Sequence, residues 1–386
     1  MPRINPLLDS LAAYPVAELN RRKDAVLARN VRLFDFSVGD PVEPTPEFIR
    51  QALLAAVPPT CPYPSVKGRK GVRDSIAAYM QRRFGVALDA ETQILPTAGS
   101  KEAVFHTPLL VVDPQADDRL VVFPDPGYPA YQRGALFAGA IAHGVVLGGD
   151  YIFRPWELPD SLLARTRMLW LNSPHNPSGA VMSLTDLERT AELCRKWDIL
   201  CISDETYADL YHEEQPHSLL EAGDEGMLVL HSLSKRSGMT GYRSGFLAGD
   251  PKIIARLKDL RDNPGLAAQD FVNAAAEVAW ADDDHVAERR VIFTAKRAVF
   301  LDFFREMGVE VIGSEASIYL WLRVPGGGDD EAWANELLQH GIVVSPGRMF
   351  GVAGGGEGYV RLALVPPLAE CREAIALWRT IMRGAV

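Results

Sequence analysis

Residues 231–246, HSLSKRSGMTGYRSGF, place one lysine among hydroxyl and guanidinium side chains directly after the apolar run 227–230. Hydroxyl and arginine side chains bind phosphate oxygens, and a lysine that is desolvated beside other cations becomes a nucleophile because its pKa falls. Taken alone, such a segment is more often a solvated loop that ends a strand. Four further polar clusters that also follow apolar runs favour the chemical interpretation.

One of these clusters, residues 99–101, opens a predicted helix after the apolar run 93–97. The first turn of a helix offers free backbone N–H groups and the positive end of the helix dipole, which together suit an anion. For this segment alone, a serine that only caps the helix is the plainer interpretation. Together with the lysine segment it predicts a phosphate site with donors from Gly99, Ser100, Lys101, Ser232, Ser234 and Arg243.

Asp204 ends the apolar run 199–203, where a carboxylate is costly unless a cation or a donor meets it. A protonated ring nitrogen would meet it, and Tyr207, three residues later, is placed to donate to a ring oxygen. Lys235 follows the next predicted strand, near the same edge of the sheet. A helix cap is the alternative for Asp204 alone, but phosphate donors, a ring-nitrogen partner, a phenol and an aldehyde-trapping lysine together predict pyridoxal 5′-phosphate as the cofactor.

Apolar runs that alternate with helical patterns predict the elements that position these clusters. Continuous apolar strands between helices indicate an α/β fold with a mostly parallel sheet covered on both faces, and sites in such sheets gather outside the carboxyl ends of the strands. The polar clusters at 99–101, 125–128, 172–176, 204–207 and 232–235 are all expected at such ends. Seven strands are predicted, at 93–97, 119–123, 141–147, 168–172, 199–203, 227–231 and 242–248.

The chain has 386 residues, more than the roughly 250 to 300 at which a single core stops growing, so two domains are predicted. Runs typical of strands and a helix near 331–340 predict a small α+β domain at 286–386, to which the N-terminal segment 1–45 contributes. Residues 46–285 form the predicted large cofactor-binding domain. The small domain is expected to contain strands at 319–324, 342–345 and 359–365, and turns at the glycine runs 326–328 and 354–356.

The composition, 47% hydrophobic and 23% charged, is that of a folded globular protein. A formal net charge of -10 argues against nucleic-acid binding, which depends on clustered Lys and Arg. No apolar stretch reaches the roughly 18 residues of a membrane span, so we expect a cytoplasmic protein without a membrane partner. The cysteines lack metal-ligand spacing, so no metal site is expected, and Cys61, Cys194, Cys201 and Cys371 are predicted to be buried free thiols.

The motif S-x-S-K-R-x-x-x-x-G-x-R-x-G-F at 232–246, with N-P-S-G at 176–179 and D-E-x-Y at 204–207, resembles the class I/II aminotransferases, which are fold-type I pyridoxal-phosphate enzymes. The similarity runs from about Asp35 to the C-terminus. It implies transfer of an amino group between an amino acid and a 2-oxo acid, such as 2-oxoglutarate, by a ping-pong mechanism. It also implies a homodimer with shared active sites.

The resemblance assigns roles residue by residue. Lys235 would carry the cofactor covalently and move the α-proton, Asp204 would pair with the pyridinium nitrogen, and Tyr207 would complete the catalytic set. The cofactor-binding residues would be Gly99, Ser100, Lys101, Tyr128, Asn176, Asp204, Tyr207, Ser232, Ser234, Lys235, Arg243 and, from the second subunit, Tyr63. The substrate-binding residues would be Gly39, Asn176 and Arg361, the last for the α-carboxylate.

Within that family, segments such as NPLLDSLAAYPVAEL, SPHNPSGAV and RLALVPPLAECREA most resemble the succinyldiaminopimelate transaminases of lysine biosynthesis. The expected donor is therefore N-succinyl-LL-2,6-diaminopimelate. Aspartate, aromatic, LL-diaminopimelate and acetylornithine aminotransferases remain alternatives within the family. A lyase or decarboxylase on the same fold and a non-enzymatic ligand sensor are the alternatives from other functional classes.

Overall fold

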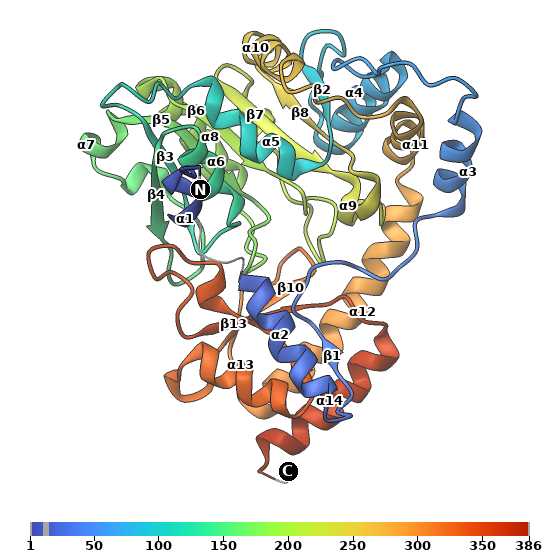
Figure 1. Cartoon of the computed structure of the whole chain (residues 1–386), viewed down its shortest axis with the longest axis vertical. Helices are drawn as coiled ribbons and strands as arrows, with labels where there is room; N and C mark the ends of the chain where they lie inside the picture. The colour runs from blue at the N-terminus through green and yellow to red at the C-terminus, as the bar shows by residue number, and fades with distance from the viewer. Residues whose placement is uncertain (1, 11–14, 385–386) are drawn as a thin grey trace.

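The computed structural model describes residues 2–10 and 15–384, so residues 11–14 of the segment NPLLDSLAAYPVAEL lie outside the described residues. Its largest sheet has seven strands, and the prediction of a mostly parallel sheet is confirmed (Figure 1). Only β8 runs antiparallel to its neighbours β2 and β7. In spatial order the strands are β2 (Ile94–Thr97), β8 (Gly245–Gly249), β7 (Met227–Ser232), β6 (Leu200–Asp204), β5 (Thr166–Asn172), β3 (Leu120–Asp125) and β4 (Ile141–Val146).

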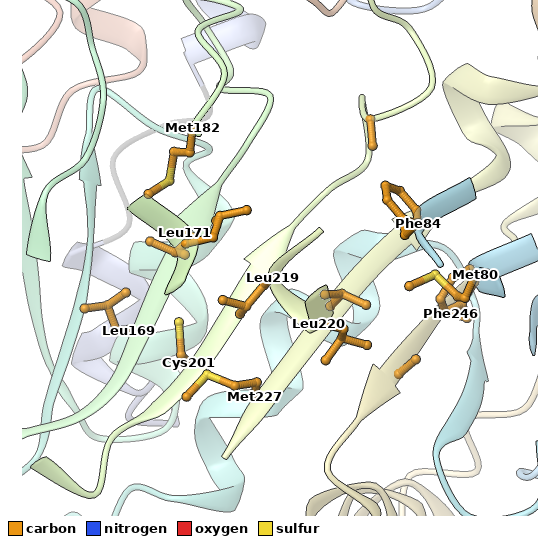
Figure 2. Close-up of a cluster of buried hydrophobic side chains, with 14 of the residues drawn as sticks. Met80, Phe84, Leu169, Leu171, Met182, Cys201, Leu219, Leu220, Met227 and Phe246 are labelled. Atoms are coloured by element: carbon orange, nitrogen blue, oxygen red, sulfur yellow. The ribbon is translucent and has the colours of Figure 1, made fainter. Parts of the chain in front are cut away.

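Helices cover both faces of this sheet because successive strand residues point to opposite sides. In β5, Leu169 and Leu171 belong to a hydrophobic cluster on one face that also contains residues of α4 (Lys70–Phe84), α8 (Leu184–Trp197) and α11 (Asp270–Ala281); Figure 2 shows part of this cluster. Met168 and Trp170 pack with α5 (Ser100–His106), α6 (Ala130–Phe137) and α10 (Pro251–Asp262) on the other. Each large apolar side chain buried in this way stabilises the fold by about 1.5–3 kcal/mol.

Capping residues set the ends of the helices α8 and α4. Ser183 caps α8 by accepting a hydrogen bond from the Asp186 backbone N–H at 3.2 Å, and Asp198 ends the helix in the left-handed region at φ 53°. Gly85 ends α4 in the same region at φ 70°, which a residue without Cβ adopts at no steric cost.

The strand predicted at 242–248 begins later, and the difference matters for the site. Residues 240–242 form the short 3₁₀ helix η4 (Thr240–Tyr242), and Arg243 turns the chain with φ 55° before β8 begins at Gly245. Because β8 is antiparallel to the other strands, its amino end lies at the edge where the parallel strands have their carboxyl ends. Arg243 therefore lies at this edge rather than within the strand.

A second hydrophobic cluster lies around smaller sheets, drawn in the lower half of Figure 1. One sheet has the order β12 (Ser345–Pro346), β13 (Tyr359–Ala363), β10 (Tyr319–Arg323) and β9 (Val311–Ile312). The other pairs β1 (Phe34–Asp35) with β11 (Ile342–Val343), which ties the N-terminal segment to the C-terminal region. The helices around them are α2 (Pro15–Leu27), α12 (Asp284–Met307), α13 (Asp330–Gln339) and α14 (Leu368–Met382).

The single strand predicted at 342–345 is divided into two short strands that belong to different sheets. β11 pairs with β1, and β12 pairs with β13. The turns predicted at both glycine runs are present. The boundaries at 45/46 and 285/286 stay a prediction, although α12 begins beside the second. The remaining elements are α1 (Pro6–Ser10), α3 (Glu47–Ala56), α7 (Asp160–Leu163), α9 (Leu233–Arg236), η1 (Thr107–Leu110), η2 (Pro155–Glu157), η3 (Leu219–Ala222), η5 (Pro325–Gly327) and η6 (Gly347–Met349).

No helix within residues 2–10 and 15–384 is both long enough and apolar enough to cross a membrane. Cys194, Cys201 and Cys371 are buried free thiols as predicted, but Cys61 is exposed. Cys61 belongs to the segment between α3 and α4, in which residues 57–63 are all exposed.

Candidate active site

A cavity of about 490 Å³ opens at the carboxyl edge of the seven-stranded sheet, and residues of the four-stranded sheet complete its wall. Strand ends and the turns that follow them contribute most of its lining, as expected for a sheet of this kind. All predicted site residues except Gly99 and Tyr63 line this cavity. They are Gly39, Ser100, Lys101, Tyr128, Asn176, Asp204, Tyr207, Ser232, Ser234, Lys235, Arg243 and Arg361.

The two exceptions differ in kind. Gly99 is the cap residue of α5 at φ 80°, and a Cβ there would overlap the guanidinium group of Arg243. Gly99 thus lets Arg243 approach the start of α5, just outside the cavity lining. Tyr63 is fully exposed and lies away from the cavity of its own chain. Its predicted role, which requires a second subunit, stays a prediction.

Asp204 is buried at the end of β6, and three donors hold its carboxylate. Its Oδ2 accepts a hydrogen bond from the Tyr131 hydroxyl at 2.9 Å, and its Oδ1 accepts from the Thr206 hydroxyl at 2.7 Å and the Thr206 N–H at 3.2 Å. Burial raises the pKa of Asp204 despite these hydrogen bonds, because a carboxylate loses solvation inside the protein. A cationic ring nitrogen in the cavity would offset that cost.

Tyr131 was missed by the sequence reasoning. Its ring stacks on Trp170 with centroids 4.9 Å apart, which fixes the hydroxyl under Asp204. A signal existed, because Tyr131 follows the predicted site residue Tyr128 by only three residues. Tyr128 precedes α6, Tyr131 lies in its first turn, and their ring centroids are 5.7 Å apart.

A pair of tyrosines forms another part of the wall. The hydroxyl groups of Tyr207 and Tyr319 lie 2.9 Å apart and share a hydrogen bond. A Cβ at residue 39 would overlap the Tyr319 hydroxyl, so a larger residue would displace this tyrosine, and the Gly39 backbone lies directly against it. Tyr319 is a second residue that the sequence reasoning missed; its strand was predicted, but nothing in the strand pattern marks one tyrosine as facing the cavity.

Arg361 lies on β13 with its guanidinium group between two aromatic rings. Its Nη1 donates to Asn176 Oδ1 at 3.0 Å and its Nη2 donates to the Ser37 carbonyl at 2.9 Å. The Tyr319 and Phe350 ring centroids are 4.1 Å and 4.2 Å from the guanidinium carbon. The buried Nε has no partner among the described residues, which leaves a donor for a carboxylate ligand.

Lys235 lies on α9 and its side chain is largely buried. Burial lowers the pKa of its amine, and the charges of Arg361 and Arg243 lower it further, while Tyr319 and Asp40 act in the opposite direction. The net shift is downward, which increases the neutral fraction of the amine and so its nucleophilicity. The structure therefore gives Lys235 the environment that trapping an aldehyde requires.

The hydroxyl groups predicted for a phosphate lie together at one end of the cavity. Ser232 Oγ donates to Ser234 Oγ at 3.0 Å, and Arg243 Nη1 donates to the Thr240 carbonyl at 2.9 Å. Ser100 and Lys101, in the first turn of α5, line the same cavity. This donor set fits a phosphate, and with the buried Asp204 and the lysine amine it fits pyridoxal 5′-phosphate.

Within the described part of the chain, no group of three or more His, Cys, Asp and Glu side chains is placed to hold a metal ion. The acidic groups of the cavity wall are Asp40 and Asp204.

Known proteins resemble this chain over nearly its whole length. The LL-diaminopimelate aminotransferase of Gloeobacter violaceus is 35% identical, with 95% of both chains covered, and that of Aquifex aeolicus is 32% identical, with 95% and 96% covered. An aminotransferase structure from Neisseria meningitidis has a TM-score of 0.91 at 31% identity, covering 98% of this chain and 100% of that one. A probable N-succinyldiaminopimelate aminotransferase from Thermus thermophilus has a TM-score of 0.89 at 28% identity, covering 96% and 100%.

The model of the family "Aminotransferase class I and II" matches residues 31–376. The fold, the cavity and the relatives agree with this match, and the predictions of the family and of the fold-type I architecture are confirmed. The protein therefore belongs to the class I and II aminotransferases, a family that depends on pyridoxal 5′-phosphate.

Proposed function

We propose that this aminotransferase uses LL-diaminopimelate as its amino donor and 2-oxoglutarate as its acceptor. The convergence of Lys235, Asp204 and Arg361 on one cavity is the observation that carries the transfer chemistry. The substrate rests on relatives that are themselves LL-diaminopimelate aminotransferases at 35% and 32% identity. These relatives favour LL-diaminopimelate over its N-succinyl derivative, which the sequence segments alone had suggested.

The charges of the cavity wall agree with this donor. Besides Arg361 and the predicted phosphate ligands, the wall contains Arg133 on α6 and Asp40 in the turn after Gly39. The far end of LL-diaminopimelate carries both a carboxylate and an ammonium group. Arg133 and Asp40 together would match these two charges, whereas an N-succinyl group replaces the ammonium with an amide and adds a carboxylate.

The roles of the residues follow from their positions. Bound pyridoxal 5′-phosphate supplies the electron sink for the charge that develops when the α-proton leaves. The Lys235 amine would remove that proton and return it, acting as general base and then as general acid. Asp204 would hold a proton on the ring nitrogen, and Tyr207 would donate to the ring oxygen.

The remaining residues would bind and orient the reactants. Arg361 would bind the α-carboxylate of donor and acceptor alike, with Asn176 and the Ser37 carbonyl holding its guanidinium group in place. Tyr128, at the wall of the cavity, would stack on the cofactor ring, for which its flat apolar face is suited. The Ser232, Ser234 and Arg243 side chains would bind the phosphate.

A panel of donors tested with 2-oxoglutarate checks the substrate. We expect the highest kcat/KM for LL-diaminopimelate, ahead of N-succinyl-LL-diaminopimelate, N-acetylornithine, aspartate and aromatic amino acids. Asp40→Asn is expected to lower kcat/KM for LL-diaminopimelate about tenfold more than for the N-succinyl donor, the effect of one lost charge-assisted contact, since any change through the pKa of Lys235 affects both donors alike. A higher kcat/KM for the N-succinyl donor would contradict the proposal.

N-Succinyl-LL-diaminopimelate is the second candidate, favoured by the likeness to the Thermus thermophilus structure at 28% identity. A single turnover without acceptor separates both candidates from a lyase. A transaminase releases one 2-oxo acid per site and retains the amino group, whereas a decarboxylase releases CO₂. The same measurement on Lys235→Ala should give no product, and a variant that transaminates normally would remove the proposed role of Lys235.

We also propose a homodimer. Tyr63 is fully exposed, and exposed apolar side chains accumulate in the surrounding segment of a single chain. They are Val38, Val42, Phe48, Leu54 and Val57. A second copy covering this segment would bury them and bring Tyr63 to the partner's phosphate site.

A further inference from the structure

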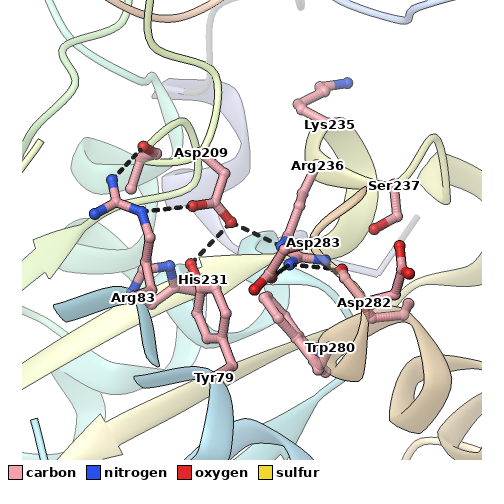
Figure 3. Close-up of polar contacts among 12 residues, drawn as sticks. Tyr79, Arg83, Asp209, His231, Lys235, Arg236, Ser237, Trp280, Asp282 and Asp283 are labelled. Carbon is pink, nitrogen blue, oxygen red and sulfur yellow. Dashed lines mark hydrogen bonds and ion pairs between the residues drawn. The ribbon is translucent and has the colours of Figure 1, made fainter. Parts of the chain in front are cut away.

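A buried ion-pair network lies on the side of α9 opposite to the cavity (Figure 3). Arg236 Nε donates to Asp209 Oδ2 at 2.7 Å, and the two side chains are only 3% and 7% exposed. Asp209 also accepts from the Tyr79 hydroxyl at 2.9 Å and from Arg83 Nε at 3.0 Å. Burial disfavours the charge on Asp209, but Arg236 and Arg83 hold its pKa below the ordinary value, so the carboxylate is ionised.

The guanidinium group of Arg236 is fixed on all sides. Its Nη1 donates to the Ala279 carbonyl at 2.6 Å, and its Nη2 donates to the Asp282 carbonyl at 3.1 Å and to Asp283 at 2.8 Å. The rings of Tyr79 and Trp280 each lie 5.0 Å from the guanidinium carbon. Lysine has no fork of donors and cannot reproduce this set of contacts.

The next residue along the chain is anchored to the same turn. Ser237 Oγ lies 2.9 Å from His285 Nε2, and His285 Nδ1 lies 2.5 Å from Asp282 Oδ1. Ser237 is fully buried, so this Ser–His–Asp chain is closed to substrates and is a connection between elements. Both residues after Lys235 are therefore tied to the turn between α11 and α12.

The two partners of this ion pair, Asp209 and Arg236, lie next to predicted site residues in the sequence. Asp209 follows Asp204 by five residues and Tyr207 by two, and Arg236 directly follows Lys235. The pair thus joins the segment that carries the predicted ring partners to the segment that carries the predicted cofactor lysine. Figure 3 shows the Lys235 amine pointing away from the Asp209 carboxylate. The network therefore contacts both segments on the side that faces away from the Lys235 amine.

The element that carries Lys235 needs such support. The α9 helix has only four residues, and so short a helix is not stable by itself because nucleation is unfavourable. The place of the Lys235 backbone must therefore be fixed by tertiary contacts. The two residues that follow Lys235, Arg236 and Ser237, make the buried tertiary contacts described above.

We propose that Arg236 and Asp209 are positioning residues, whose ion pair sets where the Lys235 amine stands relative to Asp204 and Tyr207. The inference rests on the proposed role of Lys235 and does not depend on which amino donor is used. A displacement of about 1 Å between reacting groups can cost on the order of a hundredfold in rate, so a small shift of α9 would be visible in kinetics.

Arg236→Lys tests the proposal, with Arg83→Lys as the matched control. Both variants keep their charge and both lose the forked contact near Asp209, but the hydrogen bonds of Arg83 go to residues 208–216 and not to the Lys235 segment. We expect both to lower the melting temperature. Only Arg236→Lys should lower the maximal rate of the donor half-reaction, by about a hundredfold, with the dissociation constant of the donor unchanged.

A second measurement uses the cofactor-free protein and needs no turnover. Competitive labelling of amines across a pH range, read by mass spectrometry at Lys235, gives the apparent pKa of this lysine. In Arg236→Lys the pKa should rise toward that of an ordinary lysine, because the amine leaves its desolvated place while the local charge stays the same. In Arg83→Lys the pKa should equal that of the wild type.

The outcomes separate positioning from simple stabilisation. An Arg236→Lys protein with a lower melting temperature but the wild-type rate and Lys235 pKa would overturn the proposal, as would equal effects in Arg83→Lys. If Arg236→Lys does not fold, Asp209→Asn decides by the same two measurements. Transamination by Lys235→Ala would instead remove the proposed function, which is a different result from a silent Arg236→Lys.

Discussion

Burial shifts the pKa values of two residues of the cavity in opposite directions. The pKa of Asp204 is raised and that of Lys235 is lowered, so in each case burial favours the uncharged form. A buried group that is held ionised costs the folded state free energy until a partner arrives. Ionised Asp204 and Lys235 therefore make the cofactor-free protein less stable than its packing alone would give, and the proposed ring nitrogen and aldehyde of the cofactor would remove this cost.

This cost can be measured on Asp204. Because its pKa is raised, the ionised carboxylate destabilises the folded cofactor-free protein at neutral pH, and this cost disappears as the pH falls below the ordinary aspartate range near 4. Asp204→Asn should therefore melt at a higher temperature than the wild type at pH 8 without cofactor. The difference should shrink as the pH is lowered toward 4.

With cofactor bound, Asp204→Asn should transfer the α-proton slower by orders of magnitude, since it lacks the negative charge that faces the ring nitrogen. Thermal melts with and without cofactor and single-turnover rates check both parts. An asparagine variant that is less stable at pH 8 and fully active would show that Asp204 only caps the segment after β6.

Arg361 offers a second test at the level of one side chain. Arg361→Lys keeps the charge but loses the fork that reaches Asn176 and the Ser37 carbonyl. We expect KM to rise about 10- to 100-fold for donor and acceptor together, because the proposed site would bind both α-carboxylates. Cofactor affinity, measured by fluorescence titration, should not change. A rise confined to one substrate would contradict a shared carboxylate site.

The turn that follows η6 is held by Asp125, a buried carboxylate of the seven-stranded sheet. Asp125 ends β3 and is fully buried; its Oδ1 accepts from the Val352 N–H at 2.7 Å, and its Oδ2 accepts from the N–H groups of Ala353 at 2.7 Å and Gly355 at 3.2 Å. The turn begins at Phe350, whose ring packs on the guanidinium group of Arg361. Asp125 thus connects the two sheets beside Arg361, the proposed ligand of the substrate carboxylate.

We expect Asp125→Asn to lower the free energy of unfolding by about 1–3 kcal/mol, because the amide NH₂ would face backbone N–H groups and leave donors unsatisfied. KM for both substrates should also rise as Phe350 shifts. Asp250→Asn is the matched control, since Asp250 accepts from the backbone N–H groups of Gly226 and Lys252 away from the cavity. It should destabilise the protein without changing KM, and equal KM changes in both variants would remove the link to Phe350.

For the whole molecule, the proposed dimer determines whether one chain has a complete site. Tyr63 lies outside the cavity of its own chain, so a role at the phosphate requires a second copy. Mixing inactive Tyr63→Ala and Lys235→Ala proteins after partial unfolding should restore about a quarter of the sites, because half of a random pool is mixed dimers and each has one intact site.

Two controls belong to this experiment. Each variant alone should stay inactive after the same treatment, and light scattering should show dimers throughout. A fully active monomer, or a mixture with no recovered activity although mixed dimers form, would contradict the shared site.

The sequence by itself determined the seven strands of the large sheet in chain order and the polar residues that follow them. Strand alternation, helix caps and turn residues act over a few neighbours, so they can be read along the chain. Because polar clusters follow apolar strands, and parallel strands end at one edge, most of the predicted site residues met in one cavity. The contiguous motifs around Lys235 and Asp204 were sufficient for the family and the cofactor.

The tertiary structure alone decided which groups hold these residues in place. Tyr131 reaches Asp204 across 73 positions of the chain, Tyr319 reaches Tyr207 across 112, and Arg361 reaches Asn176 across 185. Such hydrogen bonds depend on packing angles between elements, and no local propensity carries that information. The same reason explains why the strand predicted at 342–345 is divided between two sheets, since the choice of neighbour is made by the assembled fold.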